Sequence, residues 1–115
     1  MLVEAHDNIL AIVQARVGST RLPGKVLADI AGEPMLARVV SRVAAAQKVD
    51  AIVVATSNTA ADDRIVELCG ANRVAVYRGS ESDVLDRYYQ AAKAHRATIV
   101  VRITEGEVYH LGKIS

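Results

Sequence analysis

Compact aliphatic runs alternate along the chain with longer segments in which apolar residues recur at helical spacing. Four such runs, at residues 9–15, 51–55, 73–77 and 98–103, are typical of short buried strands. Apolar positions three and four residues apart predict helices from residue 34 to about 47, from 59 to 69, and from 84 to about 92. Polar segments at residues 56–58 and 78–82 are expected to be turns between these elements.

The alternation of strand and helix predicts a three-layer α/β/α, Rossmann-like domain with a mostly parallel sheet. No internal repeat and no linker interrupts the pattern. The carboxyl ends of parallel strands border a common crevice, so the loops after Ala15, Ala55, Tyr77 and Ile103 are expected to converge there. This edge of the sheet is where a ligand is expected.

The composition favours an aliphatic core. Hydrophobic residues make up 51% of the 115 residues, with four tyrosines and no Phe or Trp. Such a core suits parallel strands that are buried on both faces. Tyr88 and Tyr89 fall on the apolar side of the third predicted helix, where packing is expected rather than stacking on a base.

Charge and cysteine content exclude several classes of protein. The formal net charge is +1, which gives no broad basic field for nucleic acid or for a membrane surface. Cys69 is the single cysteine, so no intramolecular disulfide is possible and a small buried side chain is expected. No targeting leader and no membrane-spanning run is visible, and a cytoplasmic location is expected.

Positive charge is concentrated in residues 14–25, directly after the first predicted strand. This segment holds two glycines, two hydroxyl side chains and the cations Arg16, Arg21 and Lys25, and no Asp or Glu occurs from Asn8 to Ala28. Small residues let backbone N–H groups approach an anion, and the cations add charge and forked donors. The segment is therefore interpreted as a cradle for a polyphosphate.

Two familiar phosphate loops do not fit this segment. A P-loop requires four residues between its glycines and a Ser or Thr after the lysine, whereas five residues separate Gly18 from Gly24 and Val26 follows Lys25. The dinucleotide fingerprint requires three closely spaced glycines at the start of a helix. Neither a P-loop enzyme nor a Rossmann dehydrogenase is expected.

Residues 14–27, 32–35, 55–57 and 78–89 closely resemble the motifs of the spore coat polysaccharide biosynthesis cytidylyltransferases, which are related to the CMP-KDO and CMP-sialate synthetases. The resemblance extends over about residues 9–104. It implies a nucleotidyltransferase fold that uses CTP and Mg²⁺, transfers CMP to a sugar or sugar acid, and releases pyrophosphate.

In that reaction charge develops on the transferred and leaving phosphates, which Arg16, Arg21, Lys25 and the metal ion would neutralise. Arg16 and Lys25 are the predicted catalytic residues. By resemblance, Thr56, Ser57 and residues 78–83 lie near the nucleoside. The residues expected to bind the nucleotide are Ala15, Arg16, Gly18, Ser19, Arg21, Lys25, Thr56, Ser57, Arg78, Gly79, Ser80 and Asp83.

Four acidic residues at predicted helix starts have simpler interpretations. Asp62 and Asp63 are expected to be first-turn acids that favour the helix dipole rather than metal ligands. Asp83 and Asp86 are open between the same role and a place in a nucleotide-facing loop.

The resemblance ends after Thr104. Relatives continue with an Arg-Ile-Thr-Gly-Asp-Cys-Pro type segment whose Asp holds the magnesium ion, but residues 102–108 lack that Asp, and Glu105 or Glu107 is a poor substitute. The chain is therefore interpreted as a leader (1–8), a nucleotide-binding domain (9–104) and a divergent tail (105–115).

A domain truncated at this point is expected to have impaired turnover, and an uncovered strand edge is expected to favour self-association. The alternatives are a non-catalytic nucleotide-binding or assembly module and a pyrophosphorylase that uses another nucleotide.

Overall fold

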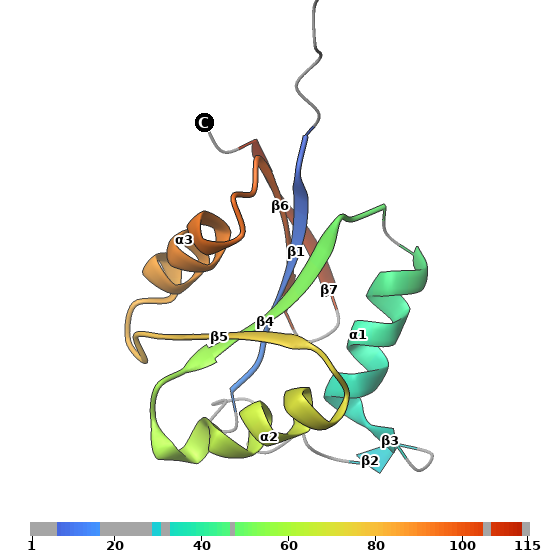
Figure 1. Ribbon diagram of the computed structural model, residues 1–115, viewed down its shortest axis with the longest axis vertical. Helices are drawn as coiled ribbons and strands as arrows, with labels where there is room; N and C mark the ends of the chain where they lie inside the picture. The colour runs from blue at the N-terminus through green and yellow to red at the C-terminus, as the bar shows by residue number, and fades with distance from the viewer. Residues whose placement is uncertain (1–6, 17–28, 31–32, 47, 105–106, 114–115) are drawn as a thin grey trace, which may run out of the picture.

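The architecture of the chain follows from a computed structural model, which describes residues 7–16, 29–30, 33–46, 48–104 and 107–113 (Figure 1). Its main sheet has the strand order β5-β4-β1-β6-β7. The first four strands in this order are parallel to one another, and β7 is antiparallel to β6. The strands are β1 (Ile9–Gln14), β4 (Ala51–Ser57), β5 (Ala75–Gly79), β6 (Ile99–Thr104) and β7 (Glu107–Lys113). A small separate hairpin consists of β2 (Asp29–Ile30) and β3 (Glu33–Pro34).

Helices cover both faces of the sheet (Figure 1). The helices α1 (Met35–Ala46) and α2 (Asp63–Ala71) pack on the face that presents Ala11 and Val13 of β1. The helix α3 (Val84–Ala94) packs on the opposite face, against Leu10 and Ile12. Because both faces of β1 are buried, its sequence is continuously aliphatic rather than alternating. The predicted three-layer α/β/α domain with a mostly parallel sheet is confirmed. Among the described helices, none has the length and apolarity needed to cross a bilayer.

Two strands extend further toward the carboxyl edge than the sequence predicts. β4 continues through Thr56 and Ser57, which the pattern assigned to a turn, and β5 includes Arg78 and Gly79. In the parallel ladder Thr56 lies opposite Arg78 and Ser57 lies opposite Gly79. Backbone pairing does not depend on side-chain polarity, so polar residues at strand ends are easily mistaken for turns. These residues are consequently held rigidly in the sheet.

The segment after β6 forms a strand that the sequence did not predict. β7 pairs with β6 from Thr104 opposite Glu107 to Ile99 opposite Lys113, with an irregularity between Val100 and Val101. The last predicted strand is therefore an interior strand, because β7 covers its outer edge. The two outer strands of the described sheet are β5 and β7.

The apolar side of α3 is narrower than its sequence suggests. Tyr88 is buried in the core, as predicted, but Tyr89 is 56% exposed and Leu85 is 76% exposed. The expectation that Tyr89 packs is therefore wrong. α3 rests on the sheet through Tyr88, Ala91 and neighbouring residues, and Tyr89 follows the helical rotation away from that contact.

Cys69 is buried in the core on the α2 side, and burial raises the pKa of its thiol from 9.0 to about 11. A raised pKa lowers the thiolate fraction at pH 8 by about 100-fold, and only the thiolate is nucleophilic. We expect a disulfide reagent at pH 8 to modify the folded chain at least roughly 100-fold more slowly than the chain unfolded in urea. Equal rates in the two states would contradict the buried environment. The assay reports on this residue alone, since the chain has one cysteine.

Candidate functional site

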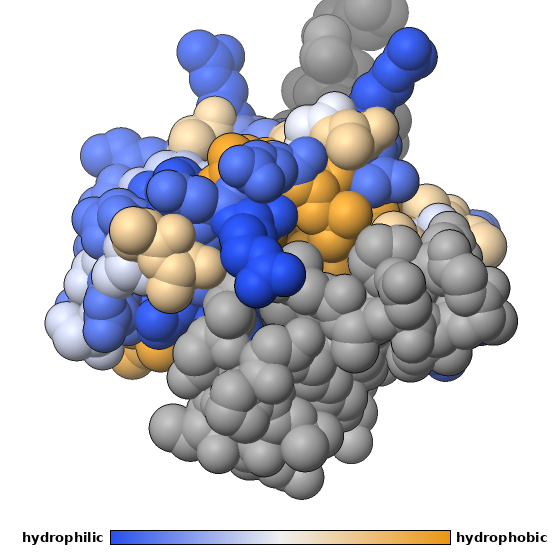
Figure 2. Space-filling model, turned by 90° about the horizontal axis from the view of Figure 1, so that it is seen from below, coloured by the Kyte–Doolittle hydropathy of each residue, from blue (hydrophilic) through white to orange (hydrophobic). Residues whose placement is uncertain are grey.

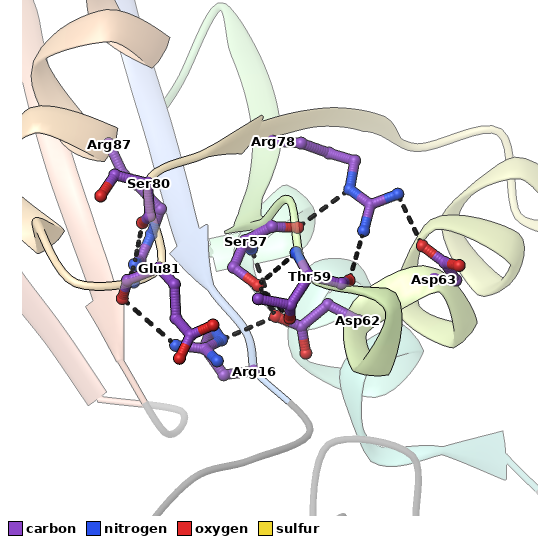
Figure 3. A network of polar contacts seen from close by, with 9 residues as sticks. All are labelled: Arg16, Ser57, Thr59, Asp62, Asp63, Arg78, Ser80, Glu81 and Arg87. Atoms are coloured by element: carbon purple, nitrogen blue, oxygen red, sulfur yellow. Dashed lines mark hydrogen bonds and ion pairs between the residues drawn. The ribbon is translucent and has the colours of Figure 1, made fainter.

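The carboxyl ends of β1, β4 and β5 lie side by side and carry a cluster of polar residues (Figure 3). The strand order reverses at β1, because β4 lies on one side of it and β6 on the other. In open α/β sheets such a reversal opens a crevice beyond the carboxyl ends of the strands. Figure 2 shows this side of the molecule from below, with a largely hydrophilic surface beside a smaller apolar area.

Arg16 lies immediately beyond β1. The ladder with β4 continues to Ala15, whose N–H donates to the carbonyl of Ala55 at 3.0 Å, so the residue before Arg16 is still held by the sheet. The Arg16 Nε donates to Asp62 Oδ2 at 2.6 Å, and its Nη1 donates to the carbonyl of Glu81 at 3.4 Å. One guanidinium group thus joins β1 to the start of α2 and to the turn before α3.

Asp62 has a larger role than the sequence pattern indicated. It is the last residue of the short 3-10 helix η2 (Ala60–Asp62) and is 0% exposed. Besides Arg16, the same Oδ2 accepts from the Ser57 backbone N–H at 3.3 Å and from the Ser57 hydroxyl. Asp62 does lie in the first turn of η2, as predicted, and the structure adds its contacts with Arg16 and Ser57. Asp63 likewise lies in the first turn of α2 and is 57% exposed.

Arg78 holds the end of β4 against α2. Its Nε donates to the carbonyl of Ser57 at 2.9 Å, and its Nη2 donates to the carbonyl of Thr59 at 2.8 Å. Its Nη1 forms an ion pair with Asp63 at 2.8 Å. All three nitrogens of Arg78 have protein partners, so its role toward a nucleotide stays a prediction.

Arg87 of α3 holds the turn at residues 80–82 in place through hydrogen bonds to two of its backbone carbonyls. Its side chain is 1% exposed, and its Nη1 donates to the carbonyls of Ser80 at 2.7 Å and Glu81 at 3.0 Å. Burial lowers the pKa of Arg87, and the nearby charge of Arg16 lowers it further. This residue was not among those predicted from the sequence. The available signal was its helical spacing from the core residue Ala91, which places it on the buried side of α3.

Gly79 and Asp83 have roles in this same turn. A Cβ atom on Gly79 would lie 3.0 Å from Arg87 Cγ and 3.0 Å from Tyr77 Cε2, so glycine allows Arg87 to pack against the strand. Asp83 caps α3, since its side chain accepts from the Asp86 N–H at 2.9 Å. Asp86 lies in the first turn of α3, where an acid favours the helix dipole, and the place of Asp83 in a nucleotide-facing loop stays a prediction.

The structure places eight of the predicted nucleotide-binding residues at or near this edge of the sheet. These are Ala15, Arg16, Thr56, Ser57, Arg78, Gly79, Ser80 and Asp83. Thr56 and Ser57 are 0% exposed, and the Thr56 hydroxyl has no hydrogen-bond partner among the described residues. The predicted residues Gly18, Ser19, Arg21 and Lys25 lie outside the described residues.

The described side chains do not fit the magnesium ion that the resemblance implies. Within residues 7–16, 29–30, 33–46, 48–104 and 107–113, no group of three His, Cys, Asp or Glu side chains could hold a metal ion. Asp62 and Asp63 are each paired with an arginine. Glu105 lies outside the described residues, and Glu107 is the first residue of β7.

Topology and site together define a three-layer α/β domain with an arginine, Arg16, just beyond the strand at which the strand order reverses. Comparison with known families agrees, since the cytidylyltransferase family model matches residues 10–108. The chain belongs to the cytidylyltransferase family.

Individual relatives support this assignment. The spore coat polysaccharide biosynthesis protein SpsF of Bacillus subtilis is 42% identical over 102 residues, covering 85% of this chain and 42% of that protein. A cytidylyltransferase structure from Leptospira borgpetersenii matches with a TM-score of 0.81 and 36% identity, covering 86% of this chain and 42% of that one.

A structure of CMP:2-keto-3-deoxy-manno-octonic acid synthetase in complex with CTP matches with a TM-score of 0.73 and 27% identity, covering 87% of this chain and 40% of that one. The chain thus spans about two-fifths of the length of each of these three relatives.

Proposed function

We propose that this chain forms the nucleotide-binding half of a CTP-using nucleotidyltransferase. The observation that carries the proposal is the Arg16 guanidinium, which is fixed at the carboxyl end of β1 where the strand order reverses. A fold neighbour with this topology was solved with CTP bound, which favours CTP over other nucleotides. The triphosphate would lie over this edge, in contact with Arg16, Arg21 and Lys25.

The chemistry proposed for the whole protein is transfer of CMP. An acceptor hydroxyl oxygen forms a bond to the α-phosphorus of CTP and its proton passes to water. The bond from that phosphorus to the bridging oxygen breaks, and pyrophosphate leaves with the electron pair. Arg16 and Lys25 would stabilise the negative charge that develops on the phosphates. A sugar or sugar acid is the proposed acceptor.

The nucleoside is proposed to lie beside residues 80–83, whose backbone Arg87 holds in place. Thr56 and Ser57 are buried, so they would shape the floor of this region from within the sheet. Arg78 would act from the same floor, by fixing the end of β4.

Nucleotide titrations test the proposal. Calorimetric titrations with CTP, UTP, GTP and ATP, each with and without Mg²⁺, are expected to show the tightest binding for CTP. A pyrophosphate-release assay with candidate acceptor sugars separates the remaining alternatives. Release identifies an active transferase, binding without release identifies a nucleotide-binding module, and a preference for UTP or GTP identifies a pyrophosphorylase of different specificity.

Lys25→Ala is expected to weaken CTP binding by roughly 10- to 100-fold, the loss typical of one charge-assisted hydrogen bond. Binding of cytidine, which lacks phosphates, is expected to change little. Calorimetry on the two ligands measures both effects, and Lys48→Ala is a matched control at an exposed lysine. Equal losses for CTP and cytidine would exclude the proposed contact between Lys25 and the phosphates.

A further inference from the structure

We propose that Asp62 is a positioning residue, which holds the Arg16 guanidinium in the orientation that receives the phosphates. This inference rests on the proposed function, since it assumes that Arg16 meets an anion. Asp62 itself would not contact the nucleotide. It is completely buried, and the carboxylate oxygen that meets Arg16 also receives two donors from Ser57.

The geometry distinguishes this ion pair from an ordinary surface pair. Ser57 lies at the end of β4, and Asp62 lies five residues later at the start of α2, so the carboxylate is fixed from two sides. Arg16 meets it through Nε at 2.6 Å with 22% of its side chain exposed. The neighbouring pair of Asp63 and Arg78 is more exposed on both sides, at 57% and 31%. Exposed pairs order a side chain weakly, whereas a buried carboxylate orders its partner strongly.

The use of Nε determines what remains for a ligand. The Arg16 Nε is directed at Asp62 and one Nη1 donor at the Glu81 carbonyl, so contacts with phosphate oxygens fall to Nη2 and to the other donor of Nη1. An arginine held in this way loses less side-chain entropy when it binds an anion than a freely rotating one. Preorganisation of this kind is the proposed contribution of Asp62.

The direction in which Asp62→Asn changes CTP affinity distinguishes a positioning role of Asp62 from simple charge compensation. If Asp62 only offset the charge of Arg16, Asp62→Asn would make the crevice more positive and would tighten the binding of CTP. If Asp62 positions Arg16, the same substitution replaces a charged acceptor by a neutral amide oxygen, loosens the hold on the guanidinium and weakens binding. Asparagine has nearly the same shape as aspartate, so packing is largely preserved.

The experiment compares Asp62→Asn with Asp63→Asn in the full chain by calorimetric titration with CTP. We expect about tenfold weaker binding for Asp62→Asn and a change of less than about twofold for Asp63→Asn. In an Arg16→Ala background, Asp62→Asn is expected to cause no further loss, since its effect acts through Arg16. Unchanged or tighter binding by folded Asp62→Asn, or a full additional loss in the Arg16→Ala background, would overturn the proposal.

A second readout does not depend on the nucleotide. In ¹⁵N-labelled protein the Arg16 Nε–H signal is expected to exchange slowly with solvent, to lose this protection in Asp62→Asn and to keep it in Asp63→Asn. If the wild-type chain binds no nucleotide, the proposed function fails while this signal still tests the contact. If Asp62→Asn does not fold, slow exchange in the wild type supports the inference, and rapid exchange there overturns it.

Discussion

Arg16→Ala is expected to weaken CTP binding by roughly 100-fold, which corresponds to about 2.7 kcal/mol. The variant loses the guanidinium that is fixed beyond β1, and a charged hydrogen bond typically contributes about 1.5–3 kcal/mol. The same change removes the ion pair of Arg16 with the buried Asp62. We therefore expect a loss of stability of about 2 kcal/mol, less than for a fully buried pair because Arg16 is 22% exposed.

Urea unfolding and calorimetric titration of the same preparation measure the two effects of Arg16→Ala. Arg42→Ala, at an exposed position of α1, is the matched control and is expected to change neither quantity appreciably. In the double variant Arg16→Ala with Asp62→Asn, stability should recover in part while CTP binding stays weak, because the buried charge is removed but the phosphate contact is not restored. Undiminished CTP binding by Arg16→Ala would contradict the placement of the triphosphate.

Arg87→Ala is expected to destabilise the fold by about 3 kcal/mol, through a cavity under α3 and the loss of two carbonyl partners. Arg87→Met should cost considerably less, about 1 kcal/mol, because it fills the same space. The charged form of Arg87 is disfavoured at this position, since burial and the nearby Arg16 lower its pKa. Its Nε also has no hydrogen-bond partner among the described residues.

Urea unfolding measures the stability of these variants, and Lys93→Ala on the exposed side of α3 is the control, expected within about 0.5 kcal/mol of the wild type. Amide hydrogen exchange in residues 80–83 should accelerate in both Arg87 variants, because neither alanine nor methionine can hold the two carbonyls. Equal stability of the Ala and Met variants would show that packing of the side-chain stem contributes little. Unchanged exchange would show that the turn does not depend on Arg87.

Much of the fold could be predicted because local patterns encode it. β1 is buried on both faces, so its aliphatic run is unbroken, and α1 shows the apolar spacing of a helix that covers a sheet. The predictions were wrong where the polarity of a residue does not match its place in the structure. Thr56 and Ser57 are polar strand residues, and Tyr89 is an apolar-looking residue on the exposed side of α3. β7 was missed because its pairing with β6 is a contact between segments and not a property of its own sequence.

The sequence by itself determined the class of the domain, the position of Arg16 just beyond the first strand and the family resemblance that the comparisons confirmed. Only the tertiary structure showed that Asp62 and Arg87 organise this edge of the sheet. The spacing of apolar residues predicts which side chains face a core, and the spacing of residues in a motif predicts what a single loop can bind. The buried carboxylate of Asp62 acquires its role from donors just beyond β1 and at the end of β4, 46 and 5 residues away in the chain, which meet only when the sheet has formed.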